Sequence, residues 1–232
     1  DYASFKPSPI SNHQADKYLS LTSLVHCLTL DAATPYKLLA NQPLIDLTSF
    51  SNSFLNRISS SGIYVTTSSS APDLSISCHL LSLKTFHLNL VASLSGHFHA
   101  SKLVFSHADT GLHNCLSGSS GNLLLADLEY AGLDSPIKQC FDYILHPKTQ
   151  SYSQSFPNWL DYFTQYLISK KDLPFLNVYS SLLALKWSLI MLNEFRSSIW
   201  ELRVLSDPSR ALRKSSILKT QYNKSLLYYR AA

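Results

Sequence analysis

Two polar stretches in the middle of the chain hold the residue types that could carry chemistry. In the first, the Asp109 carboxylate and the Asn114 carboxamide stand five residues apart, just after a short apolar run. In the second, Asp127 follows Asn114 by thirteen residues, with Glu129 close behind. The serine- and glycine-rich segment 117–122 between them has the pattern of a hairpin turn. We therefore expect Asn114 and Asp127 to meet at the two ends of one hairpin.

An oxygen-rich pair of this kind suits one class of metal ion. Mg²⁺ prefers hard oxygen ligands and keeps several waters and phosphate oxygens in its shell. Asp109 would lie nearby, where it could orient and deprotonate a hydroxyl nucleophile. A base, a metal and accurate positioning are what phosphoryl transfer requires. The spacing therefore predicts phosphoryl transfer to a hydroxyl, with Asp109 as base and with Asn114 and Asp127 holding Mg²⁺.

The elements that must position these residues are mostly helical. Apolar side chains recur at intervals of three and four residues, which is the spacing of one helical face. This pattern predicts helices over 18–28, 45–58, 73–94, 135–146, 158–170, 177–200 and 209–229. The serine-rich stretch 59–72 is expected to form an exposed loop. The predicted fold is mainly α with a small β-hairpin element (α+β), as a single domain over 1–232.

Composition limits the possible partners and compartments. Hydrophobic residues make up 45% of the chain and charged residues 15%, with a net charge of +4, so the chain is core-rich and has no dense basic tract for nucleic acid. The four cysteines form no C-x-x-C pair, which favours reduced thiols in a cytoplasmic protein. The apolar run 173–195 contains Pro174 and Lys186, so we expect a buried core helix and no membrane partner.

Both polar stretches resemble motifs of a known kinase family. His107-Ala108-Asp109 with Asn114 resembles the H-G-D-x-x-x-x-N catalytic loop of aminoglycoside phosphotransferases and the H-N-D loop of choline kinases. Residues 125–132 (Leu-Ala-Asp-Leu-Glu-Tyr-Ala-Gly) resemble the family's I-D-F-E-Y-A-G segment. Weaker matches at 24–28, 185–187 and 192–195 follow in the family's order.

The resemblance implies a fold, a reaction and a set of roles. The chain would be the C-terminal helical lobe of a protein-kinase-like fold, with catalytic loop 105–116, metal-binding hairpin segment 123–132 and C-terminal helices 135–230. It would belong to an ATP-dependent kinase of a small molecule such as an aminoglycoside, a choline-like amino alcohol or a sugar. Asp109 would be the base, Asn114 and Asp127 the Mg²⁺ and cofactor ligands, and His107 a structural prop for the loop.

The acidic residues beyond the metal ligands bear on the substrate. Glu129 would be a metal or substrate contact, and Asp134 a second substrate contact. Together with Asp142 they would suit a cationic amine, although a surface salt bridge explains Glu129 and Asp134 equally well. Two positions depart from the family pattern. Ala108 replaces Gly or Asn, and Gln139 replaces an aspartate that braces the catalytic loop in many members.

The ATP-covering lobe of such a kinase is expected to lie outside this chain. All six glycines lie at or after Gly62, so no glycine-rich phosphate loop can precede the catalytic loop. The chain begins at Asp1 and its only methionine is Met191, which indicates a processed product or a piece of a longer protein. We expect the N-terminal β lobe to act in cis and the isolated chain to be inactive.

Two other functions are open at this point. A non-catalytic binding or interaction module could derive from a kinase lobe. A metal hydrolase could use His107, Asp109 and His113, because histidine and aspartate are good transition-metal ligands. That second alternative needs a further histidine or aspartate from elsewhere in the chain. Without one, His113 is expected on the solvent side of the loop, and His26 is expected as a hydrogen-bonded core residue.

Overall fold

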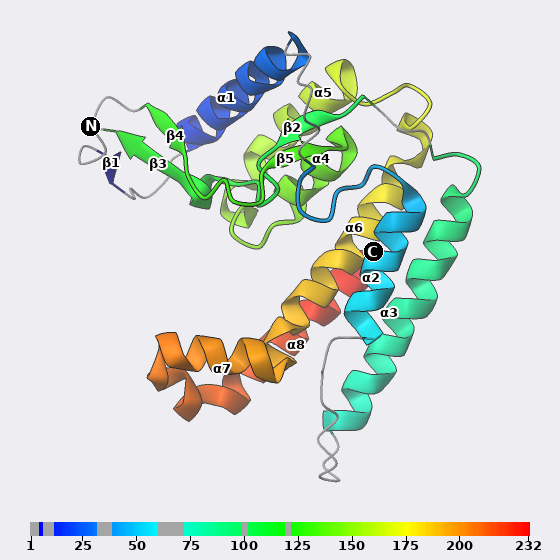
Figure 1. The fold of residues 1–232 in the computed structure, drawn as a ribbon, viewed down its shortest axis with the longest axis vertical. Coiled ribbons are helices and arrows are strands. Elements are labelled where there is room, and N and C mark those ends of the chain that lie inside the picture. Colours follow the sequence, from blue (N-terminus) through cyan, green and yellow to red (C-terminus); the bar gives the residue numbers. More distant parts are fainter. Residues whose placement is uncertain (1–4, 7–11, 32–38, 60–71, 99–101, 119–121) are drawn as a thin grey trace. The chain divides into compact units, whose positions relative to one another are not determined.

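The computed structural model describes residues 5–6, 12–31, 39–59, 72–98, 102–118 and 122–232 (Figure 1). The chain divides into two compact units. Unit 1 comprises residues 1–46 and 98–176, and unit 2 comprises residues 47–97 and 177–232. The expectation of one domain over 1–232 stays a prediction. The expected loop over 59–72 falls almost wholly on residues outside the described ones.

Unit 1 combines helices with two small antiparallel sheets. Its helices are α1 (Asn12–Asp31), α4 (Pro136–Leu145) and α5 (Phe156–Tyr166), with short 3₁₀ turns η2 (Leu112–Asn114), η3 (Gln150–Ser155) and η4 (Leu173–Phe175). One sheet has the order β1 (Phe5–Lys6), β3 (Cys115–Gly118), β4 (Leu123–Leu125), and the other pairs β2 (Val104–Ser106) with β5 (Gly132–Asp134). The predicted hairpin is present as the antiparallel pair β3–β4, with Cys115 opposite Leu125.

The core of unit 1 is aromatic and holds the helices against the sheets. Tyr18 of α1 stacks on Tyr143 of α4 and on Trp159 of α5, at centroid distances of 5.7 and 5.6 Å. The Trp159 indole N–H donates to the Cys140 carbonyl at 3.1 Å. Ser135 caps α4 by accepting the Ile137 N–H, as a serine before a first-turn proline predicts. Buried aromatic rings of this size contribute much of a domain's stability.

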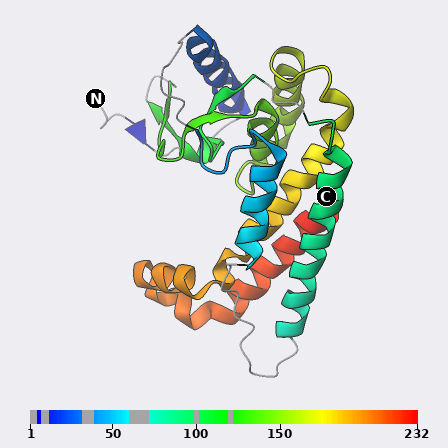
Figure 2. The ribbon, with the colours of Figure 1, turned by 45° about the vertical axis from the view of Figure 1, so that its right-hand side comes forward.

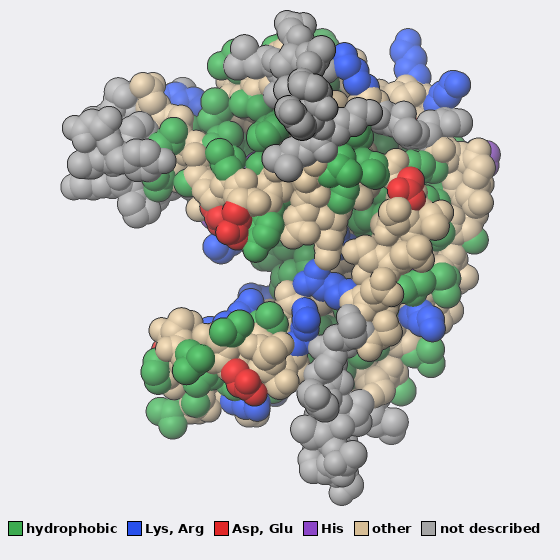
Figure 3. All heavy atoms as spheres, in the orientation of Figure 1, with side chains coloured by type: hydrophobic (Ala, Val, Ile, Leu, Met, Phe, Trp, Pro, Cys, Tyr) green, Lys and Arg blue, Asp and Glu red, His purple; other side chains and the backbone are tan. Residues whose placement is uncertain are grey.

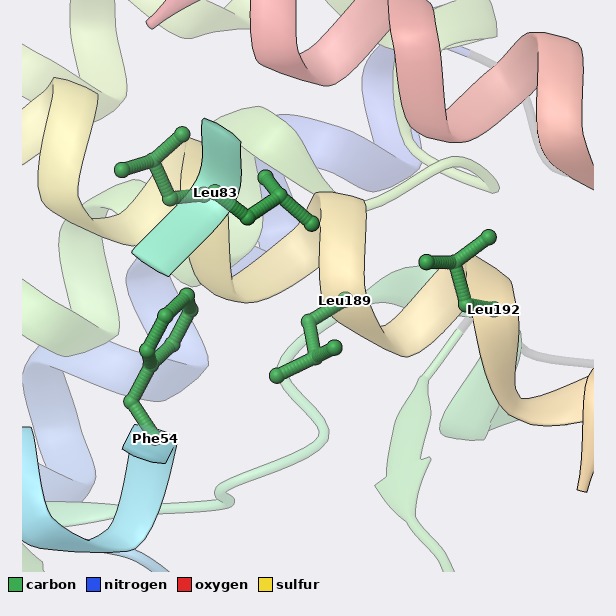
Figure 4. Close-up of a cluster of buried hydrophobic side chains, with 5 residues drawn as sticks. Phe54, Leu83, Leu189 and Leu192 are labelled. Atoms are coloured by element: carbon green, nitrogen blue, oxygen red, sulfur yellow. The ribbon is translucent and has the colours of Figure 1, made fainter. Parts of the chain in front are cut away.

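Unit 2 is helical throughout its described part. It contains α2 (Leu47–Ser59), α3 (Pro72–Leu94), α6 (Leu176–Met191), η5 (Leu192–Phe195), α7 (Ser197–Ser206), η6 (Pro208–Arg213) and α8 (Lys214–Ala231). The helices α2, α3, α6 and α8 lie side by side in two views (Figures 1 and 2). Their core includes Phe54, Leu83, Leu189 and Leu192, which come from α2, α3, α6 and η5 (Figure 4).

The helix predicted over 177–200 is wrong in its last part. Arg196 takes an extended conformation (φ −84°, ψ 121°), and α7 starts as a separate helix after it. The run Leu173–Phe195 is long and apolar enough to cross a membrane, but 56% of its most apolar window is buried within the chain. Leu189 and Leu192 belong to this run and pack in the core of unit 2. These contacts support packing within a folded unit. The fold class, mainly α with small antiparallel sheets, is confirmed.

Candidate active site

The catalytic-loop segment begins with a tight turn directly after β2. The Asp109 N–H donates to the His107 carbonyl at 2.9 Å, and Ala108 between them has φ +64°. A bond from residue i+2 to residue i across a positive φ is the rarer, strained form of γ-turn. Glycine and asparagine adopt such angles more easily than alanine. This explains why a Gly or Asn would fit position 108, and Ala108 bears strain there.

His107 connects this turn to the end of the β-hairpin. Its side chain is 3% exposed, and its Nε2 lies 2.6 Å from the Ala126 carbonyl oxygen. Because a carbonyl only accepts, Nε2 carries the proton and donates it. His107 therefore holds the loop against Ala126, the residue that precedes Asp127. This placement suits the role of a structural prop.

Asp109 and Asn114 are joined by their side chains. Asn114 Nδ2 donates to the Asp109 backbone carbonyl at 2.9 Å and to Asp109 Oδ2 at 3.0 Å. The Asp109 side chain remains 41% exposed. The loop thus presents a partly exposed carboxylate whose position is fixed by the Asn114 amide.

Two histidines complete the surroundings of Asp109. His113 Nε2 lies 3.3 Å from Oδ2, and His146 Nε2, just beyond the end of α4, lies 3.3 Å from Oδ1. The two imidazole rings stack at 4.2 Å. Hydrogen bonds from His113 and His146 hold the pKa of the Asp109 carboxyl far below its ordinary value, although burial acts in the opposite direction. The expectation that His113 lies on the solvent side is wrong, because its side chain is only 11% exposed and packs on His146.

The proton of His146 can be placed from its other nitrogen. The Lys148 backbone N–H donates to His146 Nδ1 at 3.1 Å. A nitrogen that accepts carries no hydrogen, so the neutral ring has its proton on Nε2, directed at Asp109. Burial lowers the pKa of His146, although the hydrogen bond with Asp109 partly opposes this. A lowered pKa favours the neutral ring.

Asp127 lies at the end of the hairpin beside Asn114. The Ala126 N–H donates to the Asn114 carbonyl at 2.8 Å, so the backbones of Asn114 and Ala126 are paired. Asp127 follows with φ +58° and an exposed side chain. Both hydrogen bonds of the Asn114 amide use Nδ2, which leaves its Oδ1 as a possible ligand. An amide oxygen and a carboxylate on neighbouring strand ends are a donor set that fits Mg²⁺.

The two acidic residues proposed as substrate contacts are placed very differently. Glu129 is exposed. Asp134 is fully buried and accepts hydrogen bonds from Leu44 N at 2.8 Å and Ser135 N at 2.7 Å. It also contacts Lys138, whose ammonium lies 2.6 Å from its Oδ2. A carboxylate buried with three such partners cannot contact a substrate, so the substrate role predicted for Asp134 does not fit the structure.

Gln139 reaches the catalytic segment through a histidine. Its Oε1 lies 2.9 Å from His26 Nε2, and His26 Nδ1 lies 3.1 Å from the Tyr162 hydroxyl. His26 is 1% exposed and also hydrogen-bonds the backbone of Phe105 in β2. His26 is therefore a hydrogen-bonded core residue, as expected. Gln139 is therefore connected to β2 through His26.

The loop, the hairpin and the helices that support them belong to a mainly α fold with small antiparallel sheets. In this fold the chain resembles solved choline kinases. The chain is similar to the choline kinase LicA from Streptococcus pneumoniae, with 13% identity, a TM-score of 0.50, 95% of this chain covered and 64% of that chain. The same kinase in complex with AMP gives 13% identity and a TM-score of 0.50 over 94% and 63% of the two chains.

A choline/ethanolamine kinase family protein from Mesorhizobium loti aligns at 12% identity with a TM-score of 0.47, over 99% of this chain and 69% of that one. No family model matches the sequence, and no curated protein matches it. The chain therefore has a choline kinase-like fold, and at these identities the likeness concerns the fold alone. It spans less than two thirds of the length of the LicA chains.

Two residues that surround or support the site, His146 and Lys138, were not predicted from the sequence. His146 follows a helix and precedes Pro147, a position that suggests only a helix end. Lys138 sits between Asp134, the last residue of β5, and Asp142 at intervals of four residues. In a helix this spacing places side chains on one face. That spacing was a usable signal for a buried ion-pair network. His146 had none, because its distance from Asp109 depends on how α4 packs against the loop.

Proposed function

We propose that the chain is the large lobe of an ATP-dependent phosphotransferase that acts on the hydroxyl of a small molecule. The observation that carries this proposal is the convergence of Asp109, Asn114 and the Asp127 end of the hairpin on one loop within a choline kinase-like fold. A binding module without catalysis has no physical need to keep an open carboxylate fixed in this way. The non-catalytic binding module is the alternative that an ADP-release assay must exclude.

Asp109 would act on the acceptor hydroxyl. Its low pKa makes it a weak proton acceptor before reaction, so its first role is to accept a hydrogen bond and aim the hydroxyl oxygen at the terminal phosphate. As the new O–P bond forms and ADP leaves, the hydroxyl becomes far more acidic and its proton passes to the carboxylate. Asn114 keeps the carboxylate in place through its two Nδ2 bonds.

Mg²⁺ would be held by Asn114 Oδ1 and the Asp127 carboxylate. When bound, it would neutralise negative charge that develops on the phosphate oxygens. Glu129 is exposed two residues further on and could contact either the metal or the substrate. The nucleotide base and the remaining phosphate contacts would come from the N-terminal β lobe, which we propose is supplied in cis.

The substrate proposed first is an amino alcohol of the choline type. The acidic residues favour a cationic substrate less than the sequence indicated, because Asp134 and Asp142 are paired with Lys138 in the interior. Figure 3 shows one face on which acidic side chains are sparse. The preference therefore rests on the exposed Glu129 and on the choline kinase-like fold. The four cysteines are all free, in keeping with the proposed cytoplasmic location.

The test is an ADP-release assay on the protein extended by its upstream coding sequence. We expect phosphorylation of choline or ethanolamine in preference to aminoglycosides and sugars, and a loss of at least about 100-fold in kcat for Asp109→Asn. Asp161→Asn, which changes a carboxylate on α5, is the matched control and should be silent. Turnover of none of these acceptors, with ATP still bound, would favour the binding module. Turnover by residues 1–232 alone that is abolished by Asp109→Asn would overturn the need for a second lobe.

A further inference from the structure

Three ligand atoms of different side chains converge at the open face of the loop. One carboxylate oxygen of Asp109 and one ring nitrogen each of His113 and His146 lie within 4.8 Å of one another. The loop contributes the first two residues and the end of α4 the third. His107, which the sequence placed in a possible metal site, faces Ala126 instead. The structure therefore supplies the second histidine that a metal site on this loop needed, from a position 33 residues beyond His113.

Two separations in this group match the spacing of metal ligands. Each Nε2 lies 3.3 Å from the nearer carboxylate oxygen. Charge-assisted N–H···O bonds are shorter, at about 2.7–2.9 Å. Ligands about 2.0–2.1 Å from a tetrahedral Zn²⁺ lie about 3.3 Å apart along each edge of the tetrahedron. The two histidine–carboxylate contacts thus have the length of such an edge, and they end on the two different oxygens of Asp109.

The three side chains are already close together before any ion arrives, and the nearly parallel histidine rings (12°) would have to turn for both nitrogens to point at one ion. His113 and His146 are 11% and 8% exposed and stack on each other, whereas Asp109 is 41% exposed. Gly111 makes room for the His113 ring, since a Cβ there would lie 2.6 Å from His113 Nδ1. Because the Asp109 carboxylate is exposed while the two imidazoles are largely buried, a water or another ligand could reach an ion bound there, as in metal sites with an open position.

We propose that Asp109, His113 and His146 form a binding site for a borderline transition-metal ion, with Zn²⁺ as the expected occupant. Imidazole nitrogens select Zn²⁺ over Mg²⁺, whereas the oxygens of Asn114 and Asp127 favour Mg²⁺. Ion binding through His146 Nε2 replaces the proton there, so the ring takes its proton on Nδ1 and gives up the bond from Lys148. The ion would also occupy the carboxylate that meets the acceptor hydroxyl. That second consequence, inhibition by Zn²⁺, rests on the proposed function.

Calorimetric titration of residues 1–232 with Zn²⁺ in excess Mg²⁺ tests the site itself. Exposed Cys27, Cys78 and His97 are first replaced by Ser, Ser and Ala, because they could bind zinc elsewhere. We expect one equivalent of Zn²⁺. His146→Phe and His113→Phe, which each keep an aromatic ring in the stack, should each weaken that binding by more than about 100-fold, since loss of even an outer-shell partner weakens affinity 10–100-fold.

Two outcomes are decisive, and circular dichroism confirms that each variant is folded. Zn²⁺ affinity that is unchanged in both phenylalanine variants would overturn the site. ¹⁵N spectra of labelled histidine give a second measurement on the unaltered chain, in which His146 Nδ1 should change from acceptor to protonated nitrogen as Zn²⁺ is added. Absence of that change at saturation would also overturn it.

The link to catalysis is measured separately on the two-lobed protein. Zn²⁺ should inhibit turnover of the unaltered enzyme, and a chelator should restore it. If the protein binds Zn²⁺ but phosphorylates no acceptor, the proposed function fails and the metal site stands. If it is active but Zn²⁺ neither binds nor inhibits, the metal site fails and the proposed function stands.

Discussion

Lys138 Nζ lies 2.6 Å from Asp134 Oδ2 in the interior of unit 1, and 3.0 Å from Asp142 Oδ2. All three side chains are at most 2% exposed. Burial alone would lower the pKa of Lys138, but the two carboxylates raise it above its ordinary value, so the ammonium stays charged. Asp134 also accepts the N–H groups of Leu44 and Ser135. This network joins three elements: the segment before α2, strand β5 and helix α4.

Replacing Lys138 by methionine should destabilise the chain severely. The methionine would leave Asp134 and Asp142 buried without their cation, and removal of one partner from a buried ion pair costs about 3–5 kcal/mol. Urea unfolding followed by circular dichroism measures the change. Lys102→Met, at an exposed position, should alter the free energy of unfolding by less than about 0.5 kcal/mol. Equal effects of the two substitutions would contradict the importance of the buried network.

Replacing Ala108 by glycine should stabilise the chain. Ala108 has φ +64°, a conformation that disfavours L-residues by about 1–2 kcal/mol, and glycine removes that strain while adding some unfolded-state entropy. We expect a net gain of about 0.5–1 kcal/mol, measured as a higher thermal midpoint. Ala184→Gly within α6 should lower stability by about 1 kcal/mol. A destabilising Ala108→Gly would show that the turn is not strained.

Replacing Gly111 by alanine should disturb the histidine stack. The added Cβ would lie 2.6 Å from His113 Nδ1 and 2.8 Å from its Cε1, so the ring must move away from position 111. Overpacking of this kind costs about 1–3 kcal/mol. The double variant Gly111→Ala/His113→Ala removes the clash and should recover part of the loss. A double-mutant cycle with no coupling between the two positions would contradict the predicted contact.

The stability of unit 2 should depend on pH through His87. This ring stacks on Phe54 at 4.0 Å, its Nε2 lies 2.9 Å from Ser51 Oγ, and burial lowers its pKa from 6.5 to about 4. Between these two pKa values the unfolded chain binds more protons than the folded one, so stability falls as the pH drops from 6.5 to about 4. The total change is at most about 3 kcal/mol, and it ceases below the folded-state pKa.

Unfolding titrations at several pH values check this dependence. His87→Phe keeps the stacking on Phe54 but cannot titrate, so its stability should vary less between pH 6.5 and 4. His97→Ala, at an exposed position, serves as the control and should keep the slope of the unaltered chain. An identical slope in His87→Phe would place the titrating group elsewhere.

Local patterns in the sequence were enough for the elements and for part of the site. Helical spacing of apolar residues located α1, α2 and α3, and the Ser135-Pro136 pair located the start of α4. The hairpin followed from apolar runs around a serine- and glycine-rich turn. The pairing of Asn114 with the Asp127 end followed from that hairpin. These features depend on residues close in the chain, where the intervals of three, four and two residues carry the information.

The sequence by itself determined the fold class, the helical and hairpin elements, and the loop that presents Asp109 and Asn114. Only the tertiary structure decided what surrounds Asp109. His113 is largely buried because it stacks on His146, which follows the end of α4. Asp134 is buried because it pairs with Lys138 in the interior. Such contacts depend on the packing of whole helices against the loop. Residue spacing does not predict these contacts, because the distance between two segments that are far apart in the chain is set by the core that joins them.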